Sequence, residues 1–451
     1  MKVMFRKLLS FYTTGPEKPP LSQDREEIRR VYERKRWSVF LTVTLGYGMF
    51  YLCRLSLAVV KKPLIRAGIF SPSELGTIGS ALLFAYAFGR LTNGFLADRS
   101  NIKRFMSTGL LVSAALNLAL GFTTTFYLFL ILWGVNGWFQ AMGSAPSVVS
   151  LTQWFSHSER GTRYGIWSSS HCIGEGITFA GTALVVSHFG WQSGFIAPGL
   201  VCIAAGLIMM WTHQDRPETY GLPPIAEYKN DHPPATTRAT TVGKNQLEAL
   251  KNPWVWVLAL SSASMYVSRY GINNWGILFL QMEKGHSLAE AGAIASSAPL
   301  AGLLGSVASG VISDRFFAAR RNWPTLLCGF LQIAGLTALY FIPSDHFWLD
   351  GAAMSLFGFA TGGLLVFLGG LNAVDIVPRK AAGAAMGIVG LFSYLGAGVQ
   401  EIASGYLIEG TETQVFGTTF YSFEPAFLFW GSSSLLSIVL AASTWRVKAK
   451  E

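Results

Sequence analysis

Two tyrosine–arginine pairs have the residue types and spacing to bind an anion. Tyr51 and Arg54 lie in the first long apolar run of the chain, and Tyr266 and Arg269 lie in a later one. Residues three apart share one face of a helix, so each arginine has a tyrosine one turn away. An arginine inside a membrane helix costs roughly 2.5–3.5 kcal/mol on insertion scales, and such residues usually face a polar cavity. The two pairs therefore predict a cationic pocket.

The composition identifies the class of protein that must hold this pocket. The chain has 451 residues, of which 51% are hydrophobic and 13% are charged, whereas soluble proteins carry about a quarter charged residues. Long apolar runs predict an all-α polytopic membrane protein in a lipid bilayer. We attribute the net charge of +10 to cytoplasmic loops rather than to nucleic-acid binding.

The sequence offers no pattern for an enzyme, a metal or a cofactor. It lacks a GxxxxGK[S/T] phosphate loop and the HExxH, CxxC and GxSxG arrangements. All of its cysteines fall in apolar runs without metal spacing, and a disulfide framework is not expected; they are Cys53, Cys172, Cys202 and Cys328. We therefore predict no catalytic residues, no metal site, no cofactor and no ATP-driven pumping.

The apolar runs form two sets of six around a polar stretch, Gln214–Lys251. They predict transmembrane helices near Trp37–Val60, Leu75–Ala97, Phe105–Phe122, Tyr127–Trp154, Gly165–Ser187, Ser193–Thr212, Trp254–Gln281, Leu288–Ile312, Trp323–Ile342, Leu349–Val374, Ala382–Ile408 and Pro425–Thr444. The predicted plan is an N-terminal segment (1–36), a six-helix half (37–212), a linker (213–252), a second half (253–445) and a tail (446–451).

Basic residues orient this plan. They gather in the connections Asp98–Arg104, His157–Arg163 and Asp314–Arg321, so the positive-inside rule places these connections, the linker and both termini in the cytoplasm. An exception follows the first helix, where Lys61, Lys62 and Arg66 fall on the outer side. Two readings remain open for them, a cavity mouth that attracts anions and ordinary contact with lipid headgroups.

The two halves repeat further motifs in the same order. These are Gly94-x-x-x-Asp98-Arg99 with Gly310-x-x-x-Asp314-Arg315, and Gly161-x-x-x-Gly165 with Gly383-x-x-x-Gly387. Parallel repeats of six helices are the arrangement of major facilitator transporters. We therefore predict the major facilitator fold, twelve transmembrane helices in two six-helix halves, with a binding site between the halves.

The chain also resembles organophosphate:phosphate antiporters, the family of bacterial glycerol-3-phosphate and hexose-6-phosphate carriers. The resemblance covers nearly the whole chain. It is carried by Gly46-Tyr47 with Tyr51-Leu52-Cys53-Arg54, Ala85-Tyr86-Ala87-Phe88-Gly89-Arg90, Asn136-Gly137-Trp138, Arg160-Gly161 with Trp167 and His171, Gly221-Leu222-Pro223-Pro224, and Val267-Ser268-Arg269-Tyr270.

The resemblance implies specific roles. It assigns phosphoryl binding to Arg54 and Arg269, which fits the two-pronged hydrogen bonding of a guanidinium to a phosphate. Further site residues that it implies are Arg90, His171, Tyr51, Tyr86, Tyr266 and Tyr394.

Some family positions differ in this chain. Acidic residues expected before Trp275 and near helix eight are replaced by Asn274 and Ala298, and a Gly is replaced by Glu175. Glu175 lies four residues after His171, on the same helix face, so we include it in the site. It either balances the arginines of an empty pocket or forms an ordinary interhelical ion pair. Glu401 is a second unmatched acid.

The predicted function is exchange of a sugar phosphate, hexose 6-phosphate or glycerol 3-phosphate, for inorganic phosphate by alternating access. The alternatives are a membrane sugar-phosphate sensor for a signalling kinase and a proton-coupled organic anion transporter. Because one chain contains both halves, a monomer suffices. The resemblance implies the inner membrane of a bacterium.

Overall fold

The computed structural model describes residues 10–231, 250–317, 321–377, 381–415, 418–445 and 447. Residues 1–9, 232–249, 446 and 448–451 belong to the predicted terminal segments and linker, and they lie outside this range. So do residues 318–320 of the basic connection Asp314–Arg321.

Helices dominate the described chain. The N-terminal half contains α2 (Arg25–Leu52), α3 (Ser56–Arg66), α4 (Pro72–Ala97), α5 (Ile102–Leu120), α6 (Phe126–Gln140), α7 (Ser144–Trp154), α8 (His157–Ile177), the π-helix η1 (Thr178–Thr182), α9 (Ala183–Phe189) and α10 (Ser193–Thr212). The C-terminal half contains α13 (Pro253–Met282), α14 (Leu288–Phe316), α15 (Asn322–Phe341), α16 (Phe347–Val366), the π-helix η3 (Phe367–Leu371), α17 (Asn372–Asp375), α18 (Ala382–Glu409) and α19 (Glu424–Ser443).

Helices occupy each of the predicted membrane-crossing positions within the described residues, and 8 of these spans are apolar and long enough to cross a membrane by length and composition alone. The fifth and tenth predicted spans contain the π-helices η1 and η3, and two other predicted spans are interrupted by non-helical residues. The first starts earlier than predicted, at Arg25, and breaks between α2 and α3, while the fourth divides into α6 and α7. Polar residues and short segments at such interruptions are tolerated in membrane proteins where they face other protein or a cavity.

Local sequence explains how matching helices of the two halves begin. The Ser71 side chain accepts a hydrogen bond from the backbone N–H of Glu74 at the start of α4, and the Glu74 side chain accepts one from the backbone N–H of Ser71. Ser287 and Glu290 form the same reciprocal cap on α14. Such capping boxes satisfy backbone N–H groups that have no partner inside the helix. The second membrane span of each half, which is α4 in one and α14 in the other, therefore starts with the same capping box.

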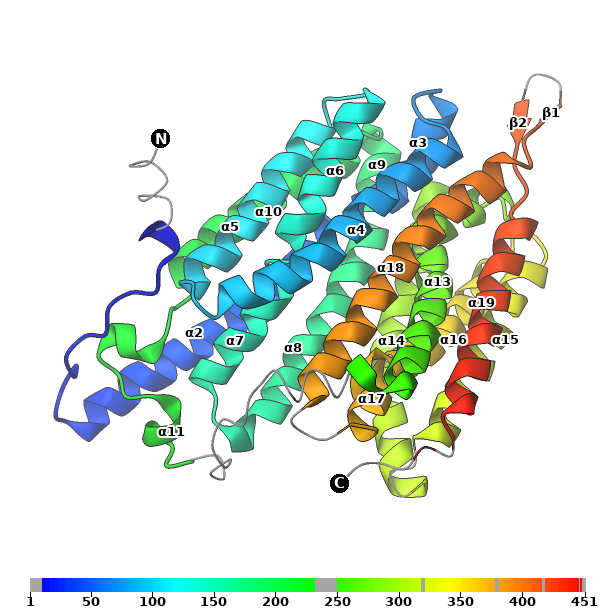
Figure 1. Ribbon diagram of the computed structural model, residues 1–451. Helices are drawn as coiled ribbons and strands as arrows, with labels where there is room; N and C mark the ends of the chain where they lie inside the picture. Colours follow the sequence, from blue (N-terminus) through cyan, green and yellow to red (C-terminus); the bar gives the residue numbers. More distant parts are fainter. Residues whose placement is uncertain are drawn as a thin grey trace.

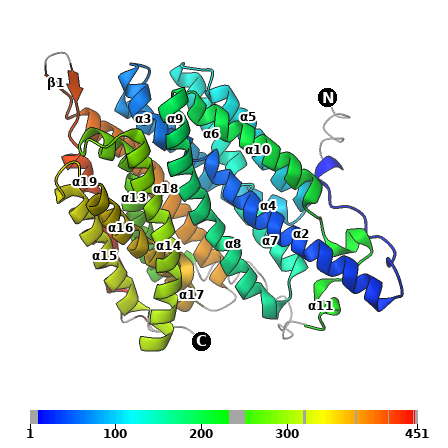
Figure 2. The ribbon, with the colours of Figure 1, turned by 180° about the vertical axis from the view of Figure 1, so that it is seen from behind.

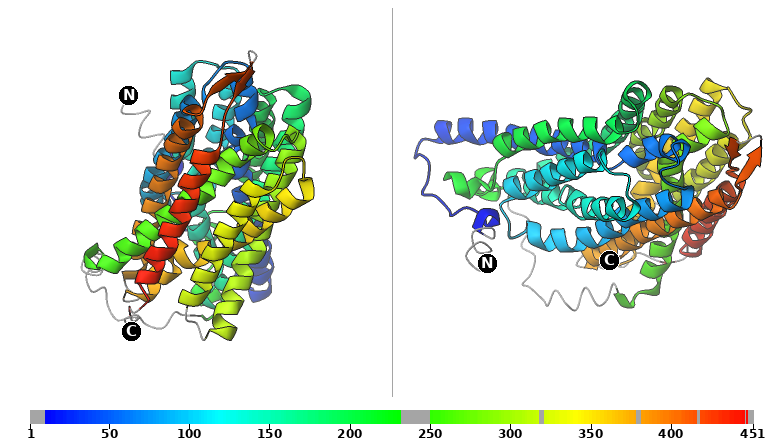
Figure 3. Two further views of the ribbon diagram at one scale, coloured as in Figure 1. Left: turned by 90° about the vertical axis from the view of Figure 1, so that its right-hand side faces the viewer. Right: turned by 90° about the horizontal axis from the view of Figure 1, so that it is seen from above.

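The two halves form separate groups of helices that meet along a long interface (Figure 1; Figure 3, right). Successive spans run in opposite directions, so one end of the bundle carries the start of α2, the segment after α10 and the end of α19. We call this the linker end. The other end carries α3 and a short hairpin of β1 (Thr413–Val415) and β2 (Thr418–Phe420), and we call it the hairpin end. The hairpin falls where the sequence predicted a loop.

The halves are closed against each other at the hairpin end. The carboxylate of Glu409 on α18 accepts hydrogen bonds from the Ser71 hydroxyl and from the Ser73 backbone, both at 2.7 Å. Nearby, a Cβ on Gly79 of α4 would stand 2.7 Å from the Glu401 side chain. Behind this contact, α8 lies beside α14 (Figure 2), and Gly292 of α14 fits against the backbone of Phe179. Glycine permits these close approaches because it has no side chain.

The segment after α10 is more ordered than a linker prediction suggests. It contains a 3-10 turn η2 (Pro217–Tyr220) and a short helix α11 (Ile225–Tyr228). Asp215 accepts hydrogen bonds from Asn101 Nδ2 at 2.9 Å and from the backbone of Ile102 at 3.3 Å, and Trp154 Nε1 donates to its carbonyl at 2.7 Å. Burial raises the pKa of Asp215. Residues 213–231 therefore pack against the N-terminal half.

Candidate functional site

Arg54 lies at the break in the first span. At the break, the Cys53 carbonyl lies outside the regular backbone hydrogen bonding of the helix. This oxygen accepts hydrogen bonds from Asn117 Nδ2 on α5 and Asn136 Nδ2 on α6, both at 3.0 Å. The Ser56 hydroxyl donates to the Leu52 carbonyl at 2.7 Å. Side chains that satisfy freed carbonyls stabilise a helix interruption. The interruption is therefore a fixed feature that holds the Arg54 backbone in place.

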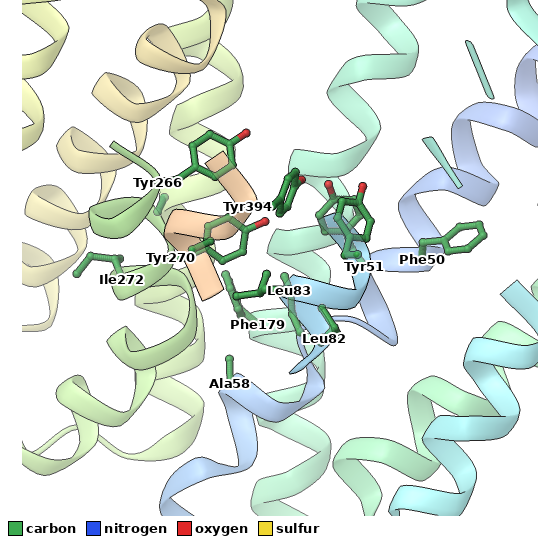
Figure 4. Packing of buried hydrophobic residues seen from close by; sticks show 14 of the residues in the cluster. Phe50, Tyr51, Ala58, Leu82, Leu83, Phe179, Tyr266, Tyr270, Ile272 and Tyr394 are labelled. Carbon is green, nitrogen blue, oxygen red and sulfur yellow. The ribbon is translucent and has the colours of Figure 1, made fainter. Parts of the chain in front are cut away.

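Aromatic rings enclose the Arg54 side chain, which is only 5% exposed. Its guanidinium lies 4.0 Å from the ring centre of Tyr86, 5.4 Å from that of Tyr51 and 5.5 Å from that of Tyr394. It also donates a hydrogen bond of 3.3 Å to the hydroxyl of Tyr270, on the other half. Figure 4 shows Tyr51 facing Tyr266, Tyr270 and Tyr394 across the interface. Cation–π contacts stabilise the desolvated charge without neutralising it.

Arg269 has a different environment. It lies on the unbroken helix α13, and its guanidinium forms an ion pair of 3.4 Å with Glu175 of α8. Asn273, one turn further along α13, donates to the same carboxylate oxygen at 3.1 Å. The ring centres of Tyr266 and Tyr270 are 5.5 and 5.4 Å from the Arg269 guanidinium. The structure therefore shows Glu175 in an interhelical ion pair with Arg269, which is one of the two readings left open. The same pair lines a cavity.

That cavity has a volume of about 530 Å³ and lies between α8 and the C-terminal half. Arg269, Glu175, Asn273 and His171 line its wall, and from there it extends past Tyr164 of α8 toward the linker end. His171 contacts the Ser168 carbonyl through Nδ1, and its ring is 5.9 Å from that of Tyr51. His171 therefore connects the cavity wall to the aromatic group around Arg54.

The remaining predicted residues lie on the same interface. The guanidinium of Arg90 is 5.5 Å from the ring centre of Tyr394, and within the described residues no acid pairs with it. Arg90 is exposed. The rings of Tyr86 and Tyr266 are 4.6 and 5.5 Å from that of Tyr394. The structure thus brings all nine predicted site residues into one connected group.

For Lys61, the structure contradicts both readings that the sequence left open for Lys61, Lys62 and Arg66. Lys61 faces neither an outer cavity mouth nor lipid headgroups, because it is 1% exposed and pairs with Glu401 of α18 at 3.3 Å. Glu401 also accepts hydrogen bonds from Asn274 and Trp275. A space of about 20 Å³ separates this pair from Arg54. Lys61 is buried because α3 packs against the opposite half, and the helix break turns α3 in that direction.

Sequence reasoning missed Tyr270 and Asn273. Tyr270 is the one side chain in the described structure that accepts a hydrogen bond from Arg54, and its ring also contacts the Arg269 guanidinium. A signal was present, since Tyr270 and Asn273 lie four residues after Tyr266 and Arg269 and so share their helix face.

The charges of this group favour an anion. The described group contains three arginines, Arg54, Arg90 and Arg269, and one carboxylate, Glu175, which pairs with Arg269, so it has two more positive than negative charges. A phosphate monoester carries about −1.5 to −2 at pH 7. Such an anion can displace the Tyr270 hydroxyl from Arg54 and the Glu175 carboxylate from Arg269, and it can accept hydrogen bonds from the paired N–H donors of both arginines.

The chain is similar to proteins of one family over most of its length. Residues 39–400 match the Major Facilitator Superfamily. A probable hexose phosphate transport protein of Chlamydia pneumoniae is 32% identical over 443 residues, 95% of this chain and 95% of that protein. The glycerol-3-phosphate transporter of Bacillus subtilis is 32% identical, covering 94% of this chain and 95% of that protein. The membrane sensor protein UhpC of Salmonella typhimurium is 31% identical, covering 86% of this chain and 89% of that protein.

Solved structures show the same fold at lower identity. A bacterial homologue of the human lysosomal transporter Spinster superposes with a TM-score of 0.72 at 18% identity, covering 91% of this chain and 96% of that chain. The nucleoside transporter NupG gives a TM-score of 0.66 at 17% identity, covering 90% of this chain and 98% of that chain. This protein is therefore a multi-pass membrane protein that belongs to the Major Facilitator Superfamily, a family of transporters rather than enzymes, and is related to its hexose phosphate and glycerol-3-phosphate transporters.

Proposed function

We propose that this protein exchanges a sugar phosphate, hexose 6-phosphate or glycerol 3-phosphate, for inorganic phosphate. The observation that carries the proposal is the group of three arginines between the halves, of which Arg54 and Arg269 are buried, together with a single carboxylate among the described residues. Its two-charge excess matches a phosphate dianion. Inorganic phosphate and a phosphate ester present the same head to Arg54 and Arg269, so each can follow the other through the site.

Binding and movement are coupled through the two halves. Arg54 belongs to the N-terminal half and Arg269 to the C-terminal half, so a phosphate held by both draws the halves together. In the described conformation the hairpin end is closed and the cavity extends toward the linker end. Opening the other side requires the Lys61–Glu401 and Ser71–Glu409 contacts to separate. Exchange becomes obligatory if the halves rock quickly only when phosphate bridges them.

Reconstitution into liposomes tests the proposal. Vesicles loaded with inorganic phosphate should take up labelled glucose 6-phosphate or glycerol 3-phosphate, and vesicles without internal phosphate should not. Absence of exchange with every phosphate ester, including phosphoglycerate, would show that the proposal is wrong. In cells, we propose that the protein lies in the inner membrane with the linker end in the cytoplasm, as a monomer.

A second candidate is a sugar-phosphate sensor, which the similarity to the membrane sensor protein UhpC favours. A sensor needs binding but little flux, so the same vesicles separate the two functions. Saturable binding of labelled glucose 6-phosphate without exchange would identify a sensor. Uptake driven by a pH gradient in the absence of internal phosphate would instead identify a proton-coupled transporter.

A further inference from the structure

The cavity beside Arg269 has two unlike walls. On α8 the wall is mostly polar, with Ser168, Ser169, His171 and Glu175. The opposite wall, on α14 and the helices that follow, is mostly apolar and consists chiefly of Ala298, Leu303, Val307, Phe357, Leu365, Val366, Leu371, Val374 and Met386. A molecule that fills the space therefore meets hydrogen-bonding groups on one side and hydrocarbon on the other.

The few hydroxyls on the apolar side are already engaged. The Ser306 hydroxyl donates to the Leu303 carbonyl at 2.8 Å, and the Thr361 hydroxyl donates to the Phe357 carbonyl at 2.7 Å. Thr361 also accepts a hydrogen bond of 3.0 Å from Gln332. A ligand hydroxyl that left water for this wall would find few partners, and an unpaired buried hydroxyl is costly.

The apolar wall is also a rigid surface. Helices α14 and α16 pack backbone against backbone, because a Cβ on Gly358 would collide with the Ala298 backbone and a Cβ on Gly362 with that of Gly302. Helices in direct backbone contact cannot move closer together. The cavity is therefore preformed on its C-terminal side.

We propose that this cavity binds the organic group of the phosphate ester, with its hydrocarbon face against α14 and α16 and its polar edge toward α8. The inference rests on the proposed function, because the phosphate must be held at Arg54 and Arg269. Both the cationic and the apolar surfaces line one continuous space, since Arg269 and Leu303 border the same cavity. The class of ligand is a phosphate monoester with an extended C–H face, such as one face of a hexose ring or an alkyl chain.

Alkyl phosphates measure the apolar contact directly. The purified protein in liposomes exchanges labelled inorganic phosphate, and methyl, ethyl, propyl and butyl phosphate are added as competitors. A methylene group fully buried in a protein improves affinity about fourfold, so we expect the inhibition constant to fall about two- to fourfold with each added carbon.

A pair of neighbouring leucines provides the variant and its control. Leu303 lines the cavity, whereas Leu304 is 66% exposed and does not. Leu303→Ala should reduce the preference for propyl phosphate over inorganic phosphate about threefold, and Leu304→Ala should leave that ratio as in the wild type.

Three results would overturn either the subsite or the proposed function. If phosphate exchange is normal but the constants stay flat or rise with chain length, the apolar subsite is wrong and the proposed function stands. If the wild-type protein neither binds nor exchanges inorganic phosphate, the proposed function itself fails. A fall with chain length that Leu303→Ala and Leu304→Ala affect equally would place the alkyl group elsewhere and also overturn the subsite.

Discussion

The two tyrosine–arginine repeats hold the same residue in different ways. Arg54 lies at a helix break, its backbone fixed by Asn117 and Asn136 and its charge faced by aromatic rings. Arg269 lies on a continuous helix, and its charge is paired with Glu175 of the opposite half. Both arginines contact Tyr270. An internal repeat therefore preserves the position of a residue but not the partner that controls it.

The difference gives the two arginines different tasks. Arg54 has no carboxylate partner in the described structure, so an arriving anion need only replace a tyrosine hydroxyl. Arg269 must first exchange one negative charge for another. We therefore propose that Glu175 competes with the substrate for Arg269 and provides a counter-charge whenever the site is empty.

The largest effect should follow from replacing either arginine by lysine. Arg54→Lys and Arg269→Lys keep the charge but lose the paired N–H donors, so we expect exchange of inorganic phosphate to fall on the order of 100-fold in each variant. Flux into phosphate-loaded liposomes measures this loss. Near-normal exchange in either variant would contradict bidentate recognition at that position.

Removing the internal competitor should have the opposite effect on binding. Glu175→Gln leaves Arg269 without a negative partner, so the Kd for inorganic phosphate should fall about tenfold. Exchange should slow, because the bound anion is no longer displaced. Binding of labelled phosphate to the purified protein measures the first change.

Glu401→Gln is the matched control. It also removes a buried carboxylate, but one that pairs with Lys61 and lies outside the large cavity. This variant should not tighten phosphate binding. Equal tightening in both variants would mean that overall charge, rather than competition at Arg269, sets the affinity.

The two hydrogen bonds to the Cys53 carbonyl should affect phosphate binding to a smaller degree, and only through Arg54. Asn117 and Asn136 donate to the same carbonyl, so either can partly replace the other. We expect about a threefold rise in the KM for phosphate in Asn117→Leu or Asn136→Leu and about a tenfold rise in the double variant. Gln332→Leu removes a buried amide of the C-terminal half that does not hold Arg269, and its KM should stay unchanged. An equal rise in this control would indicate general loss of structure.

A separate effect concerns stability in acid rather than phosphate binding. His213, beyond the end of α10, is buried with no hydrogen-bond partner for either ring nitrogen in the described structure, and burial lowers its pKa to about 3. In the C-terminal half, by contrast, His286 contacts Asp350 at 2.7 Å.

Because the folded protein keeps His213 neutral, the unfolded chain binds more protons between about pH 3 and 6.5. Stability is therefore full above pH 6.5 and is lost as the pH falls through this window. We expect the free energy of unfolding to fall by about 2 kcal/mol between pH 7 and pH 5 through His213. His213→Phe should remove this part of the loss. Thermal unfolding in detergent, followed by tryptophan fluorescence at both pH values, compares the variant with the wild type.

Apolar periodicity and repetition were enough to predict the fold. Run lengths located the membrane helices, and the repeats of Tyr51–Arg54 and Gly94–Arg99 indicated two halves. The break at Cys53 was missed because no proline or glycine marks it. It depends on asparagines from two other helices, and a local pattern does not contain such long-range contacts. Lys61 was misread for the same reason, since its partner lies in the other half.

That distant partner also matters for how the protein is made. Glu401 follows Lys61 by 340 residues, which at a synthesis rate of about 5–20 residues per second is a delay of roughly 17–70 s. During this time the first span stands in the bilayer with Lys61 unpaired and Arg54 without Tyr270. The long lysine side chain can reach the nearby membrane surface until its partner arrives. Insertion of the first helix thus precedes formation of its contacts with Glu401 and Tyr270, which must wait for synthesis of the C-terminal half.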